Sequence, residues 1–258
     1  MKDSFLEKFE KMRVVGNLAA RTLDMLSENI KVGISTNDID KLGYEFIKDN
    51  GGYSAPLFYR GFKKSLCTSL NHVVCHGIPS DKILNEGDII NVDVTAIVDE
   101  HHGDSSRMFS IGETSIKAKN LFDATYESMI RGIKILKPGI KLGDIGYEIQ
   151  SYVESKGFSV VRAFCGHGIS TKFHEPPNIL HYGKKNTGIE LMPGMTFTIE
   201  PMINAGKYDV KVLRDGWTAV TKDKSLSAQF EHTVGITENG YEIFTKSDKN
   251  NLSLQTNS

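Results

Sequence analysis

The chain repeats one order of elements, two amphipathic helices followed by a strand, and this repeat constrains its fold more than any other feature. In the first unit, apolar residues recur at steps of three and four over residues 5–30, the spacing of one helix face. Gly33 interrupts this pattern, and Ser35 or Thr36 can supply the N-cap oxygen of a second helix that continues to Gly51. The first unit therefore predicts a helix pair.

A comparable helix pair appears later in the chain. Apolar residues spaced over 126–136 lead into Gly139, and those over 145–153 lead to Gly157. A shift of 106 positions superimposes the two pairs, matching Lys31 with Lys137, Gly33 with Gly139, Ile34 with Ile140, Asp38 with Asp144, Ile39 with Ile145 and Gly51 with Gly157. This match indicates an internal duplication, although two unrelated helix pairs could converge on the same punctuation.

A β-like segment that carries an acidic residue follows each helix pair. Residues 88–98 are rich in β-branched side chains, and residues 195–201 repeat that character with alternation. Under the same shift Asp93 falls beside Glu200. Two halves that each contribute a carboxylate on an equivalent strand would place both acids near a pseudo-two-fold axis, in a cleft between the halves.

Length and tail composition define the expected domain. We predict one domain over residues 1–258, with halves of roughly 1–110 and 111–245. The tail, residues 246–258, has few apolar anchors, and we expect it to be frayed.

Charge and composition exclude several partners. With 31 Lys and Arg against 32 Asp and Glu, the chain lacks the broad basic surface that nucleic-acid binding requires. No stretch is apolar enough to span a bilayer or to act as a signal peptide, so we expect a soluble protein with no membrane partner. The cysteines are odd in number and form no CxxC pair, which favours reduced thiols and a cytoplasmic location: Cys67, Cys75 and Cys165.

Two acids lie in neighbouring strand segments. Asp93 sits in an apolar run, and Val92 and Val94 should point to the opposite face because side chains alternate along a strand. Asp104 begins the return strand after the polar turn 99–102, which can bring it back towards Asp93. A buried, unpaired carboxylate costs several kcal/mol, so these acids need a partner.

Two further acids and a histidine complete a candidate metal-binding set. Glu200 ends its strand before Pro201, Glu231 lies in another β-like run, and His167 follows an apolar segment between two glycines. Each residue alone is more often a salt-bridge or turn residue. Together, four carboxylates and one imidazole can balance and bind two divalent ions, and without metal they would repel one another.

Two other histidine pairs are weaker metal candidates. His72 and His76 are four residues apart, but the glutamate of an HExxH zinc motif is absent because residue 73 is valine. His101 and His102 lie in an acidic turn, where we expect them to be solvated.

Seven short segments, taken in order, resemble the type I methionine aminopeptidases, and the resemblance covers nearly the whole chain. The segments are Cys75-His76-Gly77-Ile78-Pro79, Asn91-Val92-Asp93-Val94-Thr95, Gly103-Asp104-Ser105-Ser106-Arg107, Gly166-His167-Gly168-Ile169, Phe173-His174-Glu175-Pro176-Pro177, Thr198-Ile199-Glu200-Pro201 and Gln229-Phe230-Glu231-His232-Thr233. This similarity implies the α+β pita-bread fold, in which two pseudo-symmetric halves with a mixed, mainly antiparallel sheet covered by helices cup a dinuclear metal site.

The resemblance also implies the residues of the site. The ligands of two divalent metal ions would be Asp93, Asp104, His167, Glu200 and Glu231, with Asp104 and Glu231 bridging. The oxygen-rich set suits Mn, Fe(II) or Co better than a structural zinc site. In the family mechanism a metal-bridging water or hydroxide attacks the carbonyl after the first residue while Glu200 helps to move the proton. His174 would hydrogen-bond the carbonyl oxygen or the scissile amide, and His76 would contact the amide nitrogen.

The family pocket for the methionine side chain can be carried over with two departures. Its residues would be Tyr59, Phe62, Cys67, Phe173 and Trp217, and aromatic and sulfur groups suit a flexible thioether. Pro56 stands where bacterial relatives commonly carry cysteine, and Phe62 stands where tyrosine is common. Both departures affect the shape of the pocket and leave the metal ligands untouched.

The resemblance implies removal of the initiator methionine from nascent polypeptides, with a small second residue favoured. Contact with the ribosome is expected for such a function, although no ribosome-binding patch is identifiable, and we expect a monomer. An X-Pro aminopeptidase or prolidase would share the five ligands but usually carries an additional N-terminal domain, whereas barely ninety residues precede Asp93 here. A non-catalytic binding protein of the same fold would typically have lost metal ligands.

Overall fold

All of the predicted helices are present in the structure, a computed structural model that describes residues 2–247 and 249. They are α1 (Lys2–Ser27), α2 (Thr36–Asp49), α3 (Ile116–Lys134) and α4 (Leu142–Ser155). Ser35 is the N-cap of α2, and its hydroxyl oxygen accepts a hydrogen bond from the backbone N–H of Asp38. Helix α3 begins at Ile116, about three turns before Tyr126, where the apolar spacing that predicted it starts. No helix of the described chain is both long and apolar enough to cross a membrane.

Short strands and one 3-10 turn make up the rest of the regular structure. The turn is η1 (Tyr59–Gly61), and the strands of the first half are β1 (Tyr53–Ser54), β2 (Cys67–Leu70), β3 (Val73–Cys75), β4 (Ile89–Val98) and β5 (His101–Ser110). The strands that follow the second helix pair are β6 (Ser159–Val160), β7 (Gly166–Gly168), β8 (Glu175–Ile179), β9 (Thr196–Ile199), β10 (Met202–Asn204), β11 (Val210–Val212), β12 (Ala219–Thr221), β13 (Ser227–Gln229), β14 (Glu231–Ile236) and β15 (Tyr241–Ile243).

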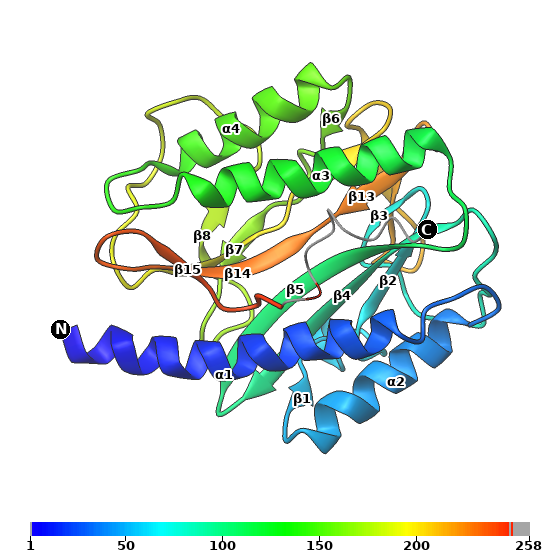
Figure 1. The fold of residues 1–258 in the computed structure, drawn as a ribbon, viewed down its shortest axis with the longest axis horizontal. Coiled ribbons are helices and arrows are strands. Elements are labelled where there is room, and N and C mark those ends of the chain that lie inside the picture. Colours follow the sequence, from blue (N-terminus) through cyan, green and yellow to red (C-terminus); the bar gives the residue numbers. More distant parts are fainter. Residues whose placement is uncertain (1, 248, 250–258) are drawn as a thin grey trace.

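One large sheet joins the two halves of the chain. Its strand order is β1-β4-β5-β14-β9-β7-β8, with β2 added to β4 and β15 to β14. The pairings between these strands are antiparallel, and two three-stranded sheets, β13-β10-β6 and β11-β12-β3, lie beside it. Strands β5 and β14, from opposite halves of the sequence, are neighbours at the centre (Figure 1). The α+β architecture with a mainly antiparallel sheet is therefore confirmed.

Each helix pair covers its own half of the sheet. Figure 1 shows α1 and α2 along the lower side of the molecule and α3 and α4 along the upper side. The two largest clusters of buried apolar side chains divide in the same way, one built mainly from α1, α2 and β4 and the other from α3, α4, β9 and β14. Both cores lie on one face of the sheet, because Val92 and Val94 belong to one core, Val234 belongs to the other, and all three point away from the face of Asp93 and Glu231. The opposite face of the sheet is left free for polar side chains.

Equivalent positions of the two helix pairs have the same local geometry. Gly33 and Gly139 have φ values of 91° and 89°, and Gly51 and Gly157 have 79° and 81°, a region open to glycine at little steric cost. The carboxylate of Asp144 accepts from the backbone N–H of Lys141 at 3.0 Å, as that of Asp38 does at Ser35 at 3.3 Å. The predicted pseudo-symmetry of the halves therefore extends to the turns that join their helices.

The histidine pair 101–102 corrects one sequence-based expectation. The turn between β4 and β5 consists of Asp99 and Glu100 alone, both with positive φ, and the two histidines already belong to β5. His101 is buried, and the ring of His102 stacks on Phe173. The pair is therefore not solvated, and Asp104 is the fourth residue of its strand rather than the first.

The described part of the C-terminal tail contacts α1. Ser247 donates a hydrogen bond to Asp24, and the ammonium group of Lys249 pairs with Glu28. The expectation that residues 246–258 are frayed stays a prediction, and residue 248 and residues 250–258 lie outside the described chain.

Candidate metal centre and its cavity

The β4–β5 hairpin brings two of the predicted ligands together. Asp93 pairs with Ser106, and Thr95 pairs with Asp104. Residues directly opposite each other in an antiparallel pair share a face, as do alternate residues along one strand. Asp93 and Asp104 therefore lie diagonally across the hairpin on the same face of the sheet.

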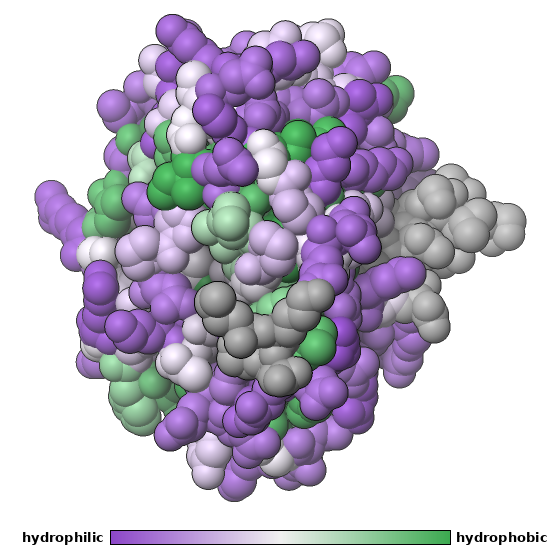
Figure 2. Space-filling model, turned by 90° about the vertical axis from the view of Figure 1, so that its left-hand side faces the viewer, coloured by the Kyte–Doolittle hydropathy of each residue, from purple (hydrophilic) through white to green (hydrophobic). Residues whose placement is uncertain are grey.

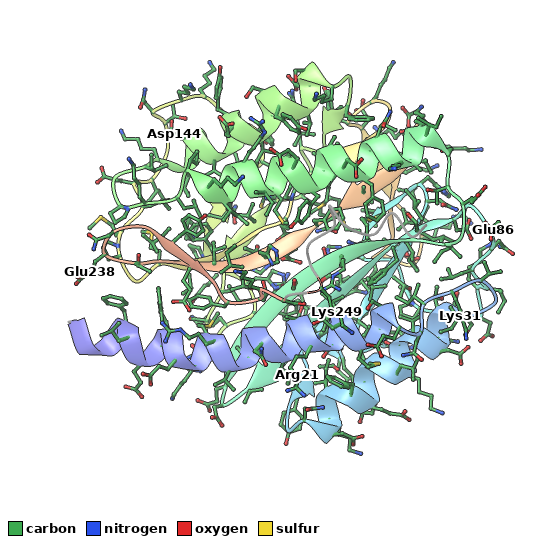
Figure 3. The ribbon with its side chains drawn as sticks, in the orientation of Figure 1. Arg21, Lys31, Glu86, Asp144, Glu238 and Lys249 are labelled. Carbon is green, nitrogen blue, oxygen red and sulfur yellow. The ribbon has the colours of Figure 1, made fainter. Side chains whose placement is uncertain are left out.

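Strands β14 and β9 add two glutamates to that face. Glu231 pairs with Ser106 and so extends the row of residues across the junction of the halves. His232 pairs with Ile199, the last residue of β9, which places Glu200 beside Glu231. The charged residues labelled in Figure 3, such as Glu86 and Glu238, lie at the periphery instead, so these buried acids are a distinct group.

His167 faces the carboxylates from the middle of β7. Its Nε2 lies 3.7 Å from Oδ2 of Asp104 and 3.6 Å from Oε1 of Glu200. Its Nδ1 lies 3.1 Å from the carbonyl oxygen of Gly168, to which it donates its proton. Burial lowers the pKa of His167 to about 4, so the ring is neutral near pH 7 and Nε2 presents a lone pair to the acids.

Burial raises the pKa of all four acids in the metal-free site. The pKa of Asp93 rises to about 7 and that of Glu200 to about 8. Those of Asp104 and Glu231 rise well above their ordinary values, first through burial and then through the charges of the neighbouring carboxylates. The cluster therefore resists full ionisation unless a cation accompanies it.

The donor atoms fit divalent metal ions. Ligand atoms of Asp104, His167 and Glu231 all lie within 4.8 Å of one another. Oδ1 of Asp93 is buried without a hydrogen-bond partner, and no Lys or Arg of the described chain forms an ion pair with the four acids. A divalent cation would balance the charge of the acids and give that oxygen a partner. Carboxylate and imidazole groups are common ligands of such ions.

Neighbouring polar groups fix two of the carboxylates. The hydroxyl of Thr95 donates to Asp104 at 2.7 Å, and that of Thr198 donates to Glu200 at 2.7 Å. The side-chain amide of Gln229 donates to the second oxygen of Glu200 at 3.2 Å. Partners of this kind orient metal ligands and hold their rotamers.

The acids and His167 line a cavity of about 390 Å³ together with every residue predicted for substrate binding. Those residues are Tyr59, Phe62, Cys67, His76, Phe173, His174 and Trp217. The ring centroids of Phe62 and Trp217 are 5.1 Å apart, and those of Tyr59 and Phe173 are 5.0 Å apart. One side of the cavity is therefore aromatic and the other carries the carboxylates.

His76 and His174 stand between these two sides. Nδ1 of His174 lies 3.1 Å from the hydroxyl of Tyr59, and its ring centroid is 4.2 Å from that of His167. His76 has a φ of 55°, packs its ring on Phe164 and lies outside any helix, so the HExxH reading of residues 72–76 is excluded by geometry as well as by sequence. Burial is the main cause that lowers the pKa of both rings, which favours neutral imidazoles.

Sequence reasoning assigned no role to several residues that line or support the site. The lining residues are Arg60, Thr95, Ala163, Phe164, Cys165 and Met202. Gln229 and Thr198 stood in the quoted motifs, whereas His181 carried no recognisable signal. Its Nε2 accepts the backbone N–H of Glu200 at 3.0 Å, at the point where β9 ends and Pro201 follows.

Replacing His181 by leucine is expected to destabilise the protein by about 1–3 kcal/mol, because the buried N–H of Glu200 loses its acceptor. The midpoint of thermal unfolding should fall by about 5 °C. His181→Gln keeps an acceptor oxygen and should recover part of the loss, and His72→Leu, at an exposed histidine, is the control. An unchanged midpoint for His181→Leu would show that this hydrogen bond does not support Glu200.

Comparison with known proteins decides the family. Residues 10–238 match metallopeptidase family M24. The chain belongs to this family. Membership implies the use of divalent metal ions, in agreement with the donor set described above, and it confirms the expected pita-bread fold.

Two of the most similar relatives are named methionine aminopeptidase. A protein named methionine aminopeptidase from Rickettsia prowazekii is 55% identical over 242 residues, 93% of each chain. The crystal structure of methionine aminopeptidase from this organism superimposes with a TM-score of 0.92, and the match covers 93% of this chain and 97% of the chain in that structure. The methionine aminopeptidase of Escherichia coli strain K12 is 52% identical, over 93% of this chain and 91% of the relative.

A prolidase structure shares the fold alone. Prolidase from Pyrococcus furiosus superimposes with a TM-score of 0.76 at 22% identity, and the match covers 94% of this chain but 64% of that one. The family members 52–55% identical are thus named aminopeptidases, whereas the prolidase is a distant relative.

Proposed function

We propose that the protein is a methionine aminopeptidase that removes the N-terminal methionine from nascent polypeptides and favours a small second residue. The observation that carries this proposal is the cavity itself, in which three buried acids, the half-buried Asp93 and a neutral histidine share the lining with a group of aromatic rings. Relatives 52–55% identical across nearly their whole length carry the same name. The four acids and the imidazole identified above, Asp93, Asp104, Glu200, Glu231 and His167, are proposed as the ligands of two ions, Mn, Fe(II) or Co.

The division of the cavity suggests how substrate is held. The thioether of the first residue would pack on the aromatic wall formed by Tyr59, Phe62, Phe173 and Trp217, with the thiol of Cys67 nearby. Pro56 and Phe62 both line this cavity, so the two departures from relatives lie where they alter its shape. The free amino group would lie towards the carboxylates.

The chain's own residues supply proton transfer and hydrogen bonds for hydrolysis. Divalent ions in such a site lower the pKa of water and counter negative charge that develops on the carbonyl oxygen. Glu200, held by Thr198 and Gln229, would take the proton from the attacking water and pass it to the leaving amine. If the Tyr59 hydroxyl donates to Nδ1 of neutral His174, then Nε2 carries a proton that can be donated to the carbonyl oxygen, and His76 would contact the scissile amide.

Location, partners and assembly complete the proposal. Three free thiols fit a reducing cytoplasm, where nascent chains and the ribosome are present. We propose a monomer of one domain over residues 1–258, with halves divided near residue 110. On the face shown in Figure 2, hydrophobic residues occur in small groups among hydrophilic ones, without the continuous patch typical of an obligate interface.

Metal-dependent release of free methionine from Met-Ala-Ser tests this function. Protein stripped with chelator should show no release, and Mn, Fe(II) or Co added singly should restore it, with a plateau near two ions per chain. Ala-Pro peptides are the comparison, because a prolidase-like enzyme would cleave them and leave Met-Ala-Ser intact. Absence of release from both peptides with every metal would instead support a binding protein.

A further inference from the structure

Arg60 is the one Lys or Arg among the described residues that line the cavity. Arg60 is exposed, whereas Asp104, Glu200 and Glu231 are buried and Asp93 is half-buried. The guanidinium carbon lies 5.3 Å from the ring centroid of Tyr59 in a cation–π contact. The cavity therefore has its acids at the inner end and one permanent positive charge at its entrance.

The backbone holds Arg60 in place at a conformational cost. Phe58, Arg60 and Gly61 have φ values of 67°, 46° and 89°, and the first two are residues that rarely adopt positive φ. The base of this loop is tied by backbone hydrogen bonds from Phe58 to Phe62 at 2.7 Å and from Phe62 to Tyr59 at 2.9 Å. Left-handed non-glycine residues persist where surrounding bonds impose them, and they are common at ligand-binding sites.

The guanidinium of Arg60 contacts the ring of Tyr59 but no acidic side chain of the described residues. Within the described chain, no hydrogen bond or ion pair joins its guanidinium to another residue. Tyr59, on whose ring the guanidinium lies, also has its hydroxyl 3.1 Å from Nδ1 of His174, and this places Arg60 near the proposed position of the scissile bond. A guanidinium held at such a mouth is free to bind a carboxylate.

We propose that Arg60 forms a subsite for a carboxylate on the third residue of the substrate. The inference rests on the proposed aminopeptidase function. With the first side chain on the aromatic wall and the small second residue beside His174, as the proposed function requires, the third would be the first residue whose side chain reaches the mouth. Peptides with Asp or Glu at that position should be cleaved faster than peptides with Lys there.

The test uses three C-terminally amidated peptides, so that no terminal carboxylate competes for the guanidinium. Met-Ala-Glu-Ser, Met-Ala-Gln-Ser and Met-Ala-Lys-Ser are cleaved by the metal-loaded protein at low salt, and kcat/KM is measured. The expected order is Glu above Gln above Lys, with a Glu to Lys ratio of about fivefold, the size of an exposed ion pair. The ratio should approach one in high salt, because exposed pairs are screened.

Variants distinguish Arg60 from the general field of the protein. Arg60→Gln should remove the ratio and Arg60→Glu should reverse it, whereas Lys63→Gln, at an exposed cation three residues away, should retain it. A wild-type ratio of one, or a ratio that survives Arg60→Gln in protein with an unchanged melting curve, would overturn the subsite. Failure to release methionine from any of the three peptides would overturn the aminopeptidase function first, and the two failures are thereby separated.

Discussion

Replacing Asp104 by asparagine is expected to reduce kcat/KM for methionine release from Met-Ala-Ser by about a thousandfold or more. Asp104 lies between Asp93 and Glu231 and faces Nε2 of His167 at 3.7 Å. The amide keeps the shape of the side chain and removes its charge, so the site loses a ligand at its centre. Metal ions contribute several kcal/mol to such reactions, and each factor of ten in rate corresponds to about 1.4 kcal/mol.

Asp99→Asn is the matched control for this substitution. Asp99 lies on the turn of the same hairpin, is exposed and has a φ of 45°, which asparagine tolerates. Both variants should remain folded. In Asp104→Asn the amide replaces a buried carboxylate of the same shape, and in Asp99→Asn the changed side chain is exposed. Metal content should fall in Asp104→Asn only. Activity near the wild-type value in Asp104→Asn with full metal content would remove this residue from the proposed ligand set.

The helices could be predicted because their signals are local. Repeated apolar spacing and a capping hydroxyl defined α2, and Ser35 is its N-cap in the structure. The first turns of α3 were missed because their buried face is built partly from small or polar residues, such as Ala118 and Thr125, which dilute the apolar period. Ile116, the large apolar residue that starts the helix, is 80% exposed.

A site residue could be predicted from the sequence where a charged side chain occurs within an apolar strand, because such a charge needs a partner. Val92 and Val94 are fully buried, as strand alternation required, and Asp93 between them had to face something else. His102 could not be placed in this way, because its environment depends on contacts with distant residues, Ser170 and Phe173. Local composition predicts a turn there, and tertiary contacts override it.

Residues whose role depends on backbone geometry escaped prediction. Arg60 lies at the cavity through a left-handed conformation that its own side chain does not favour. His181 accepts a hydrogen bond from the backbone N–H of Glu200, 19 positions later in the chain, and the residues around His181 in the sequence do not indicate this bond. Motif matching located the acids because their types are constrained by metal chemistry, whereas these supporting residues are constrained only by the fold.

The second large effect is expected on stability, where metal-free protein should lose thermal stability as pH rises from about 6.5 to 8.5. The pKa of Asp93 is about 7 and that of Glu200 about 8 in the folded state, and those of Asp104 and Glu231 are higher still. Unfolded, these groups titrate near 3.8 and 4.5. In this window the folded protein therefore holds more protons than the unfolded chain, and raising the pH favours unfolding.

Buried histidines give the opposite slope below this window. The pKa values of His167, His181 and His232 are about 4, 3 and 4 in the folded state against 6.5 when unfolded. The stability that these neutral histidines contribute is lost as pH falls below about 6.5, so the effect of the acids is best measured above that pH. Metal-free stability should thus be greatest near pH 6–7 and decline on either side.

Melting curves of chelator-treated and Mn-loaded protein at matched pH measure this effect. We expect the metal-free midpoint to fall by on the order of 10 °C between pH 6.5 and 8.5, given about 2–4 °C per kcal/mol for a protein of this size. The loaded protein should show no such fall, because bound cations favour ionised carboxylates and binding strengthens with pH. Glu200→Gln cannot ionise and should flatten the metal-free slope, whereas Glu86→Gln, at a peripheral acid (Figure 3), should not. Parallel curves with and without metal would mean that the four acids are not the charged groups that the metal neutralises.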